Sequence, residues 1–273
     1  MESPQGTPFR ISVVMTALEA LLLGLLQGIT ELLPISSSGH LALAELWLGV
    51  RIPQGLLGFD VLLHTGSLLA LVLCYSKTWL RVLRSPFIAD RAGMRTLLLL
   101  IIVTIPAGIA GVLFGEALDA MRSLTALGVG FLVSAFVLLV AERMPGQRPF
   151  TSLTVREVLL IGIVQVCALL PSVSRSGVTI AAGRALKLKR TDAVDFSFLM
   201  AVPAIAGATL FAAVQLANGS LSLPSPAVSS VGFLASFGAS IFAILALRVF
   251  VQRFSTAWFA LYLIPLAVLL LAR

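Results

Sequence analysis

Two polar segments carry the side chains of this chain that could do chemistry, and both run from an early Gln through Leu-Leu-Pro to Ser-Gly. The first reads GLLQGITELLPISSSGH over residues 24–40, and the second reads GIVQVCALLPSVSRSG over residues 162–177. In the first, Gln27 and Glu31 are four residues apart, so a helix places them on one face. An amide and a carboxylate in this arrangement can hold a hard cation that keeps several waters.

Hydroxyls and an imidazole follow in the first segment, after the Leu-Leu-Pro sequence. Ser36, Ser37 and Ser38 offer hydroxyls and backbone N–H groups where a new helix begins. A helix N-terminus is an anion site because of its dipole and its free donors. His40 lies one turn beyond Ser36, so an imidazole and a hydroxyl can meet at one phosphorus atom. Either Ser37 attacks with His40 as its base, or His40 attacks while Ser37 orients the phosphate.

The second segment adds a cation. Arg175 stands inside an apolar stretch, where charge is costly, and an ionisable residue in such a place marks a working site. Arginine binds phosphate through two parallel hydrogen bonds, and Ser174, Ser176 and Gly177 bring further hydroxyl and backbone donors. Thr179 lies one turn beyond Arg175. The two segments together predict phosphoryl transfer, in which arginine and helix ends hold phosphate oxygens, the carboxylate holds a metal ion, and a serine or histidine attacks.

The rest of the chain is apolar enough to place these segments in a membrane. The composition is 59% hydrophobic and 11% charged, and the mean hydropathy is +1.05, which is typical of polytopic helical membrane proteins. Six segments are long and apolar enough to span a bilayer, approximately residues 57–76, 96–115, 124–141, 195–216, 227–247 and 255–272. Segments 12–49 and 154–186 are each broken by Leu-Leu-Pro and a Ser-rich loop, which predicts two re-entrant helix-loop-helix hairpins.

The repeat of the polar segment predicts the architecture of the whole chain. We expect an all-α polytopic membrane protein with a single integral membrane domain over residues 1–273, built from two interlocked inverted-topology repeats, residues 11–142 and 153–273. Each repeat holds one re-entrant hairpin and three transmembrane helices, and because three is odd, the second repeat must be upside down relative to the first. The hairpins then enter from opposite sides, and their tips meet near the middle of the membrane.

The distribution of basic residues predicts the orientation. Of 19 Lys and Arg residues, 14 lie in one set of loops, which includes residues 77–95 and 184–192. Four lie on the other side, namely Arg10, Arg51, Arg122 and Arg273, and the remaining one, Arg175, lies inside the membrane. The positive-inside rule places the larger set in the cytoplasm and both termini outside, and it leaves the site open to the outer, periplasmic side. The net charge of +7 is then explained by topology and anionic lipids, and nucleic acid is excluded as a partner.

One further polar pair lies outside the two segments. Asp60 and His64 are four residues apart within the span predicted over residues 57–76. We interpret them as a local hydrogen-bonded pair of that helix rather than as part of the site.

The motifs Gln-x-x-x-Glu, Leu-Pro-Ile-Ser-Ser-Ser-Gly-His and Pro-Ser-Val-Ser-Arg-Ser-Gly-x-Thr closely resemble the signatures of the bacterial undecaprenyl pyrophosphate phosphatase family, the bacitracin-resistance type. The resemblance covers essentially the whole chain. It implies an enzyme of the bacterial inner membrane that removes one phosphate from undecaprenyl pyrophosphate and so recycles the lipid carrier of cell-wall synthesis. Gln27 departs from the commonest pattern, which has Glu and thus one more anionic metal ligand, and Ser172 replaces the usual Gly after Pro171.

The resemblance also implies roles for particular residues. Those matched here are Glu31, Ser37, His40, Arg175 and Thr179, with Ser36 and Ser174 alongside. A divalent cation, magnesium or calcium, is implied as the cofactor.

A transporter is the alternative function. Inverted repeats with broken helices are a transporter architecture, so the same site could flip a polyprenyl-phosphate lipid instead of hydrolysing it. Release of inorganic phosphate by the purified protein separates the two functions. The lipid substrate and the membrane are the predicted partners, and a homodimer is left open.

Overall fold

The computed structural model describes residues 15–49 and 56–273. Within these ranges all regular elements are helices, and there is no β-strand. The α-helices are α1 Ala17–Leu32, α2 Ser37–Leu48, α3 Leu56–Cys74, α4 Ser76–Ile88, α5 Arg91–Ala120, α6 Leu124–Glu142, α7 Val155–Val166, α8 Arg175–Ala185, α9 Arg190–Ala217, α10 Pro226–Arg253 and α11 Trp258–Leu271. Two short 3-10 helices, η1 Phe150–Ser152 and η2 Cys167–Leu169, precede and follow α7. Two predicted outer-side basic residues, Arg10 and Arg51, lie outside the described residues.

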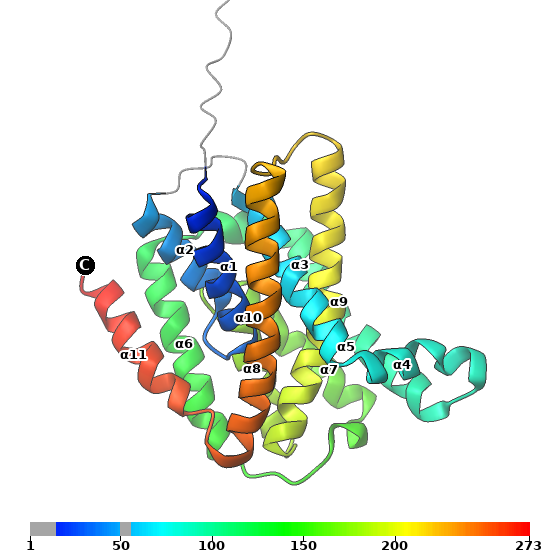
Figure 1. Cartoon of the computed structure of the whole chain (residues 1–273). Coiled ribbons are helices and arrows are strands. Elements are labelled where there is room, and N and C mark those ends of the chain that lie inside the picture. The colour runs from blue at the N-terminus through cyan, green and yellow to red at the C-terminus, as the bar shows by residue number, and fades with distance from the viewer. Residues whose placement is uncertain (1–14, 50–55) are drawn as a thin grey trace, which may run out of the picture.

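Both broken segments form a pair of short helices, as their Leu-Leu-Pro sequences predict. The first hairpin consists of α1 and α2, with 16 and 12 residues, and the second consists of α7 and α8, with 12 and 11 residues. At ~1.5 Å per residue, none of these helices crosses a hydrocarbon core of ~30 Å. In Figure 1, α1 begins and α2 ends at the upper end of the bundle, whereas the segment before α7 and the start of α9 lie at the lower end.

Each hairpin begins with the same capping device. Thr16 accepts a hydrogen bond from the backbone N–H of Glu19, whose side chain accepts one from the backbone N–H of Thr16, and Thr154 and Glu157 repeat this arrangement at the start of α7. Such a capping box satisfies two orphan donors at a helix N-terminus. The repeat therefore extends upstream of the two polar segments.

The hairpins pack closely against helices that are distant in the sequence. Helix α1 lies along α10, and α7 lies against α5. Glycine permits both contacts, since a Cβ atom at Gly24 would lie 2.4 Å from the carbonyl oxygen of Gly232, and one at Gly162 would lie 2.7 Å from that of Val103. A larger residue at either crossing would force the helices apart.

Large apolar side chains cover much of the outer surface of the bundle. Val112 is 84% exposed, and exposed aromatic residues on three further helices include Phe136, Phe211 and Phe242. Helices α5, α6, α9 and α10 are each long and apolar enough to cross a bilayer, and α3 with α4 is a fifth candidate that bends by 78° between the two helices. An apolar surface of this extent fits lipid and confirms a polytopic helical membrane protein.

Two expectations about individual elements need correction. Residues 77–95 were expected to form a basic loop, but most of them belong to helix α4, because apolar residues alternate with the cations at helical spacing. The span expected over residues 255–272 is the 14-residue helix α11, which is too short to cross a bilayer core alone. It begins late because the backbone of Phe254 is extended and the chain turns before Trp258.

Candidate active site

The tips of the two hairpins meet around a cavity of about 180 Å³, which we call the tip cavity. It is lined by Thr30, Glu31, Ser36, Ser37, Ser38, His64, Ala168, Val173, Ser174, Arg175 and Ser176. Ser176 Oγ donates a hydrogen bond of 2.9 Å to the carbonyl oxygen of Leu33 and so links one tip directly to the other. The structure thus brings together the two polar segments, although 138 residues separate Ser37 from Arg175.

Glu31 is the centre of the tip cavity. Its Oε1 atom accepts a 2.5 Å hydrogen bond from Nη2 of Arg175, with which it forms an ion pair. Its Oε2 atom accepts a 2.5 Å hydrogen bond from the hydroxyl of Ser37. Gln27 Nε2 donates to the same Oε2 atom at 3.2 Å. The Glu31 carboxylate is buried, so a paired cation and several donors are needed to offset its desolvation. The ion pair of Glu31 with Arg175 joins the carboxylate of the first hairpin to the guanidinium of the second hairpin.

Part of the Arg175 guanidinium is not used by the protein. Its Nη1 atom is buried and has no hydrogen-bond partner within residues 15–49 and 56–273. A buried donor without a partner costs free energy, which a ligand acceptor can recover. Arg175 can therefore keep its contact with Glu31 through Nη2 and offer Nη1 to an anion in the tip cavity.

Two helix N-termini face the tip cavity with the same cap. Ser36 Oγ accepts a hydrogen bond from the backbone N–H of Gly39, and Ser174 Oγ accepts one from that of Gly177. Each capping serine also contacts the serine two residues later, at 3.3 Å for Ser36 and 3.2 Å for Ser174. The positive ends of α2 and α8 thus lie at one cavity, and this arrangement favours a ligand with several negative charges.

Backbone strain accompanies these tips. Ser36 has a φ of 72° and Ser172 a φ of 57°, both in the left-handed region that glycine adopts more easily. At Ser172 this explains why the family resemblance leads one to expect Gly. Gly130 of α6 permits the close approach, since a Cβ atom there would lie 1.9 Å from the carbonyl oxygen of Pro171. Strained backbone of this kind is found at ligand sites, where the surrounding packing maintains it.

His64 belongs to the site, although the sequence interpretation left it outside. Its Nδ1 atom lies 2.7 Å from the backbone carbonyl oxygen of Asp60, which is the local bond that the spacing predicts. Its Nε2 atom points the other way and lies 3.4 Å from Glu31 Oε2. His64 is therefore the one histidine of the chain that lines the tip cavity. Only the packing of α3 against α1 brings it there, and no local pattern signals this contact.

Besides Gln27, which contacts Glu31 from behind, three of the expected site residues lie beside the tip cavity rather than on its wall. Both ring nitrogens of His40 have partners, the backbone oxygen of Ser36 at 2.7 Å and the hydroxyl of Tyr262 at 2.8 Å. Thr179 Oγ1 contacts Ser197 at 2.7 Å and also donates to backbone carbonyls of its own helix. Gly177 contributes its backbone N–H to the Ser174 cap. These residues support the walls of the site, and a direct contact with a ligand stays a prediction for each.

The coordinating oxygens that the protein supplies can hold a divalent cation only when a bound substrate adds further oxygens. Within the described residues, no group of three or more His, Cys, Asp or Glu side chains is placed to hold a metal ion. Gln27 Oε1 is buried beside Glu31 and has no hydrogen-bond partner there, so it is an oxygen available for coordination. One carboxylate and one amide oxygen fit Mg2+ or Ca2+ when phosphate oxygens and water complete the coordination.

Comparison with known proteins agrees with the family resemblance that the motifs carry. The family described as bacitracin resistance protein BacA matches residues 20–269. Undecaprenyl-diphosphatase 3 of Bacillus cereus is 37% identical over 259 residues, which cover 94% of this chain and 97% of that protein. Undecaprenyl-diphosphatase of Gemmatimonas aurantiaca is 38% identical over 269 residues, which cover 94% and 98%. The protein of the same name from Thermodesulfovibrio yellowstonii is 41% identical over 193 residues, 70% of this chain and 72% of its own.

Proposed function

Because this chain belongs to the bacitracin resistance protein BacA family, and because its relatives are named undecaprenyl-diphosphatase, we propose that it hydrolyses undecaprenyl diphosphate to undecaprenyl phosphate and inorganic phosphate. It is a membrane enzyme that returns the lipid carrier to cell-wall synthesis. The observation that carries the proposal is the meeting of Glu31, Ser37 and Arg175 in one cavity between two helix N-termini. This arrangement supplies hydrogen-bond donors for a diphosphate. It also supplies a hydroxyl that is hydrogen-bonded to a carboxylate.

Ser37 is the nucleophile that the geometry favours over His40. The Ser37 hydroxyl donates to Glu31 Oε2, so its proton can pass to that carboxylate while Oγ forms a bond to the terminal phosphorus. The bond from phosphorus to the bridging oxygen breaks, and undecaprenyl phosphate leaves with the electron pair. Water then attacks the phosphoserine, the bond from phosphorus to Oγ breaks, and inorganic phosphate leaves. One proton of that water returns to Ser37 Oγ, and Glu31 releases its proton to solvent. His40 lacks a free ring nitrogen, because Ser36 and Tyr262 engage both. Arg175 Nη1 and the two helix ends stabilise the charge that develops on the transferred phosphoryl group.

Two neighbouring serines test this assignment. Ser37→Ala should lower kcat by at least ~10²-fold, since it removes the attacking atom. Ser38→Ala is the matched control, because Ser38 lines the same cavity but contacts Ser36 instead of Glu31, and it should stay within about five-fold of wild type. Equal effects of the two substitutions on phosphate release would exclude Ser37 as the nucleophile.

Glu31 and Gln27 Oε1 would hold a divalent cation, Mg2+ or Ca2+, together with the substrate phosphates. When bound, it would neutralise phosphate charge that Arg175 alone cannot offset. Gln27→Glu should then lower the magnesium or calcium concentration that supports half-maximal phosphate release, because it adds an anionic ligand. Full activity of the wild type in excess chelator would contradict a role for the metal.

The topology consists of two interlocked inverted repeats, residues 11–142 and 153–273, with both termini outside the cytoplasm. A C-terminus outside requires the short helix α11 to cross where the bilayer is locally thinned. The reciprocal packing of the hairpins supports it, since α1 lies along α10 of the second repeat and α7 lies against α5 of the first. The equivalent capping boxes and capping serines support it as well. In this orientation, the first hairpin and the site open to the outer side of the bacterial inner membrane.

Cysteine labelling of intact cells tests the orientation. In a chain with Cys74 and Cys167 replaced by serine, Ser220→Cys should react with a membrane-impermeant thiol reagent added from outside. Lys187→Cys should react only after the membrane is opened, and it serves as the matched control. A Ser220→Cys variant that reacts only from the cytoplasm would overturn the proposed topology.

A phosphate-release assay tests the function itself. The purified protein in lipid nanodiscs should convert undecaprenyl diphosphate to undecaprenyl phosphate with one inorganic phosphate released per lipid. Movement of a polyprenyl-phosphate lipid between leaflets without any phosphate release would instead favour the transporter alternative.

A further inference from the structure

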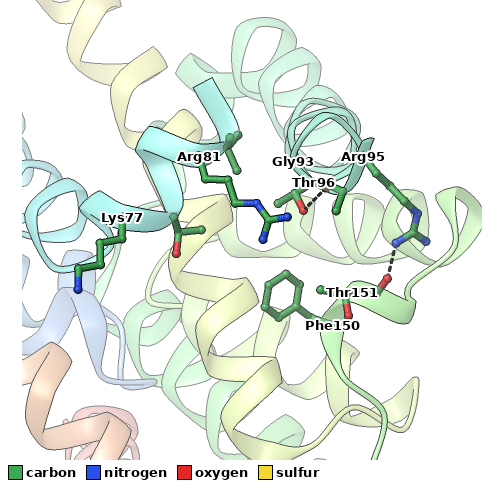
Figure 2. Close-up of a pocket in the computed structure, with 10 residues that line it drawn as sticks. Lys77, Arg81, Gly93, Arg95, Thr96, Phe150 and Thr151 are labelled. Carbon is green, nitrogen blue, oxygen red and sulfur yellow. Dashed lines mark hydrogen bonds between the residues drawn. The ribbon is translucent and has the colours of Figure 1, made fainter. Parts of the chain in front are cut away.

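A second and larger cavity, about 490 Å³, lies away from the site, between α4, the first turns of α5 and η1. We call it the α4 cavity. Its lining consists of Lys77, Thr78, Arg81, Val82, Ala92, Gly93, Arg95, Thr96, Phe150 and Thr151. Figure 2 shows that Arg81 points across the cavity toward Gly93 and Thr96, with Phe150 on the opposite wall. Three cations and three threonines at one cavity favour an anionic ligand with hydrogen-bond acceptors.

The charges of the α4 cavity do not cancel. Arg81 forms a two-point contact with Asp90, at 2.6 and 3.2 Å, and Asp90 also caps α5 by accepting from the backbone N–H groups of Ala92 and Gly93. The hydrogen bonds from Arg81 and from the α5 backbone lower the pKa of Asp90 to about 2, so it is ionised at neutral pH. Lys77, Arg81 and Arg95 against Asp90 still leave two positive charges.

Arg95 has a different task from the other two cations. Its guanidinium donates to the backbone carbonyl oxygens of Thr151 and Leu153, as Figure 2 shows for Thr151, and so fastens η1 to α5. This contact maintains the wall of the α4 cavity. Lys77 is therefore a cation that a ligand can recruit, and Arg81 can join it through its Nη1 atom, which the contact with Asp90 does not use.

Helix α4 has the geometry of an interfacial helix. It bends by 78° from α3, and in Figure 1 it projects sideways from the lower end of the bundle. Its apolar residues Leu80, Leu83, Phe87 and Ile88 are exposed, and Phe87 is 88% exposed. Lys77 and Arg81 lie on one face of α4, whereas Leu80, Leu83 and Phe87 lie on another. Such a separation of cationic from exposed apolar residues is typical of a helix that lies in the headgroup region of a bilayer.

From these observations, we propose that the α4 cavity binds the phosphate of an anionic phospholipid headgroup. Lys77 and Arg81 hold the phosphate, the threonine hydroxyls contribute hydrogen bonds, and the acyl chains lie against the exposed apolar residues of α4. These apolar residues favour a lipid over free inorganic phosphate, because a free ion would leave them without an apolar partner.

Lipid retention measured by native mass spectrometry tests the proposal. The protein is released from nanodiscs of phosphatidylcholine with about one fifth phosphatidylglycerol, and the bound lipid is identified. Lys77→Ala and Arg81→Ala should each weaken phosphatidylglycerol binding about five-fold, the factor that corresponds to ~1 kcal/mol for one basic residue near an anionic surface. Arg253→Ala removes a basic residue that does not line the cavity, and it should leave binding unchanged.

Asp90→Asn gives a result that a merely structural role would not. Asn still caps α5 but removes the negative charge, so phosphatidylglycerol should bind several-fold more tightly than to wild type. The proposal is wrong if all four variants retain the same amount of phosphatidylglycerol, or if phosphatidylcholine is retained equally well. Binding of millimolar inorganic phosphate to protein that retains no phosphatidylglycerol would make the cavity a free-phosphate site and would also overturn the proposal.

Discussion

Glu31→Gln is expected to reduce phosphate release from undecaprenyl diphosphate by at least ~10³-fold in kcat, within the range known for the loss of a general base. Gln keeps the shape of the side chain but cannot accept the proton of Ser37, and it no longer offsets the charge of Arg175. Removal of one partner leaves a buried cation unpaired, which perturbs its position as well. The measurement is steady-state phosphate release by the purified variant in nanodiscs.

Glu19→Gln is the matched control for this substitution. Glu19 lies on the same helix, but it is part of the capping box at the start of α1, where Gln serves equally well. Its activity should equal that of wild type. If Glu31→Gln retained more than about a tenth of wild-type kcat, Glu31 could not be the base, and the attacking group would have to be activated in another way.

Arg175→Lys should cost a similar factor, ~10³-fold in kcat/KM, although the charge is kept. An ammonium is a point charge, whereas the guanidinium contacts Glu31 through Nη2 and has Nη1 free for the phosphate. The variant therefore loses either the contact that orders the carboxylate or the one that orders the substrate. The loss should fall on kcat as well as on KM, because Arg175 acts on charge that develops in the transition state.

Arg184→Lys on the same helix controls for the loss of a buried guanidinium. Arg184 donates to the backbone carbonyl oxygen of Leu188, at the end of α8 remote from the tip cavity. It should keep kcat/KM within about five-fold of wild type. Near-normal turnover of the Arg175→Lys variant would show that Arg175 need not contact Glu31 and the phosphate at the same time.

The sequence predicts most of the helices because their signals are local. Apolar length predicts the spans now seen as α5, α6, α9 and α10 and the helix α3, and Leu-Leu-Pro predicts both hairpin breaks. Helix α4 was missed because its density of cations resembles that of a cytoplasmic loop. Its apolar residues at helical spacing carried the missing signal, but most of them stay exposed, so no contact with the rest of the chain pointed to a helix.

The site was predictable where residues of one motif act together, and less so where tertiary packing decides. Glu31 and Arg175 were expected to meet, because two inverted hairpins bring equivalent tips together. The positions of the two histidines relative to the tip cavity were not predictable. His40 forms a hydrogen bond with Tyr262 of α11 and lies beside the tip cavity, whereas the packing of α3 on α1 brings His64 to its wall. Both contacts join residues from separate helices, and nothing in their local sequence records them.

The central claim is that residues from both hairpins form a single phosphatase centre, and a double-mutant cycle on Glu31 and Arg175 tests it most directly. The kcat/KM of phosphate release is measured for Glu31→Gln, Arg175→Lys and the double variant. Because the two side chains are in contact at 2.5 Å, the double variant should be within about five-fold of the worse single variant. Losses that multiply, to on the order of 10⁶-fold, would mean that the two residues act independently and would contradict a shared centre.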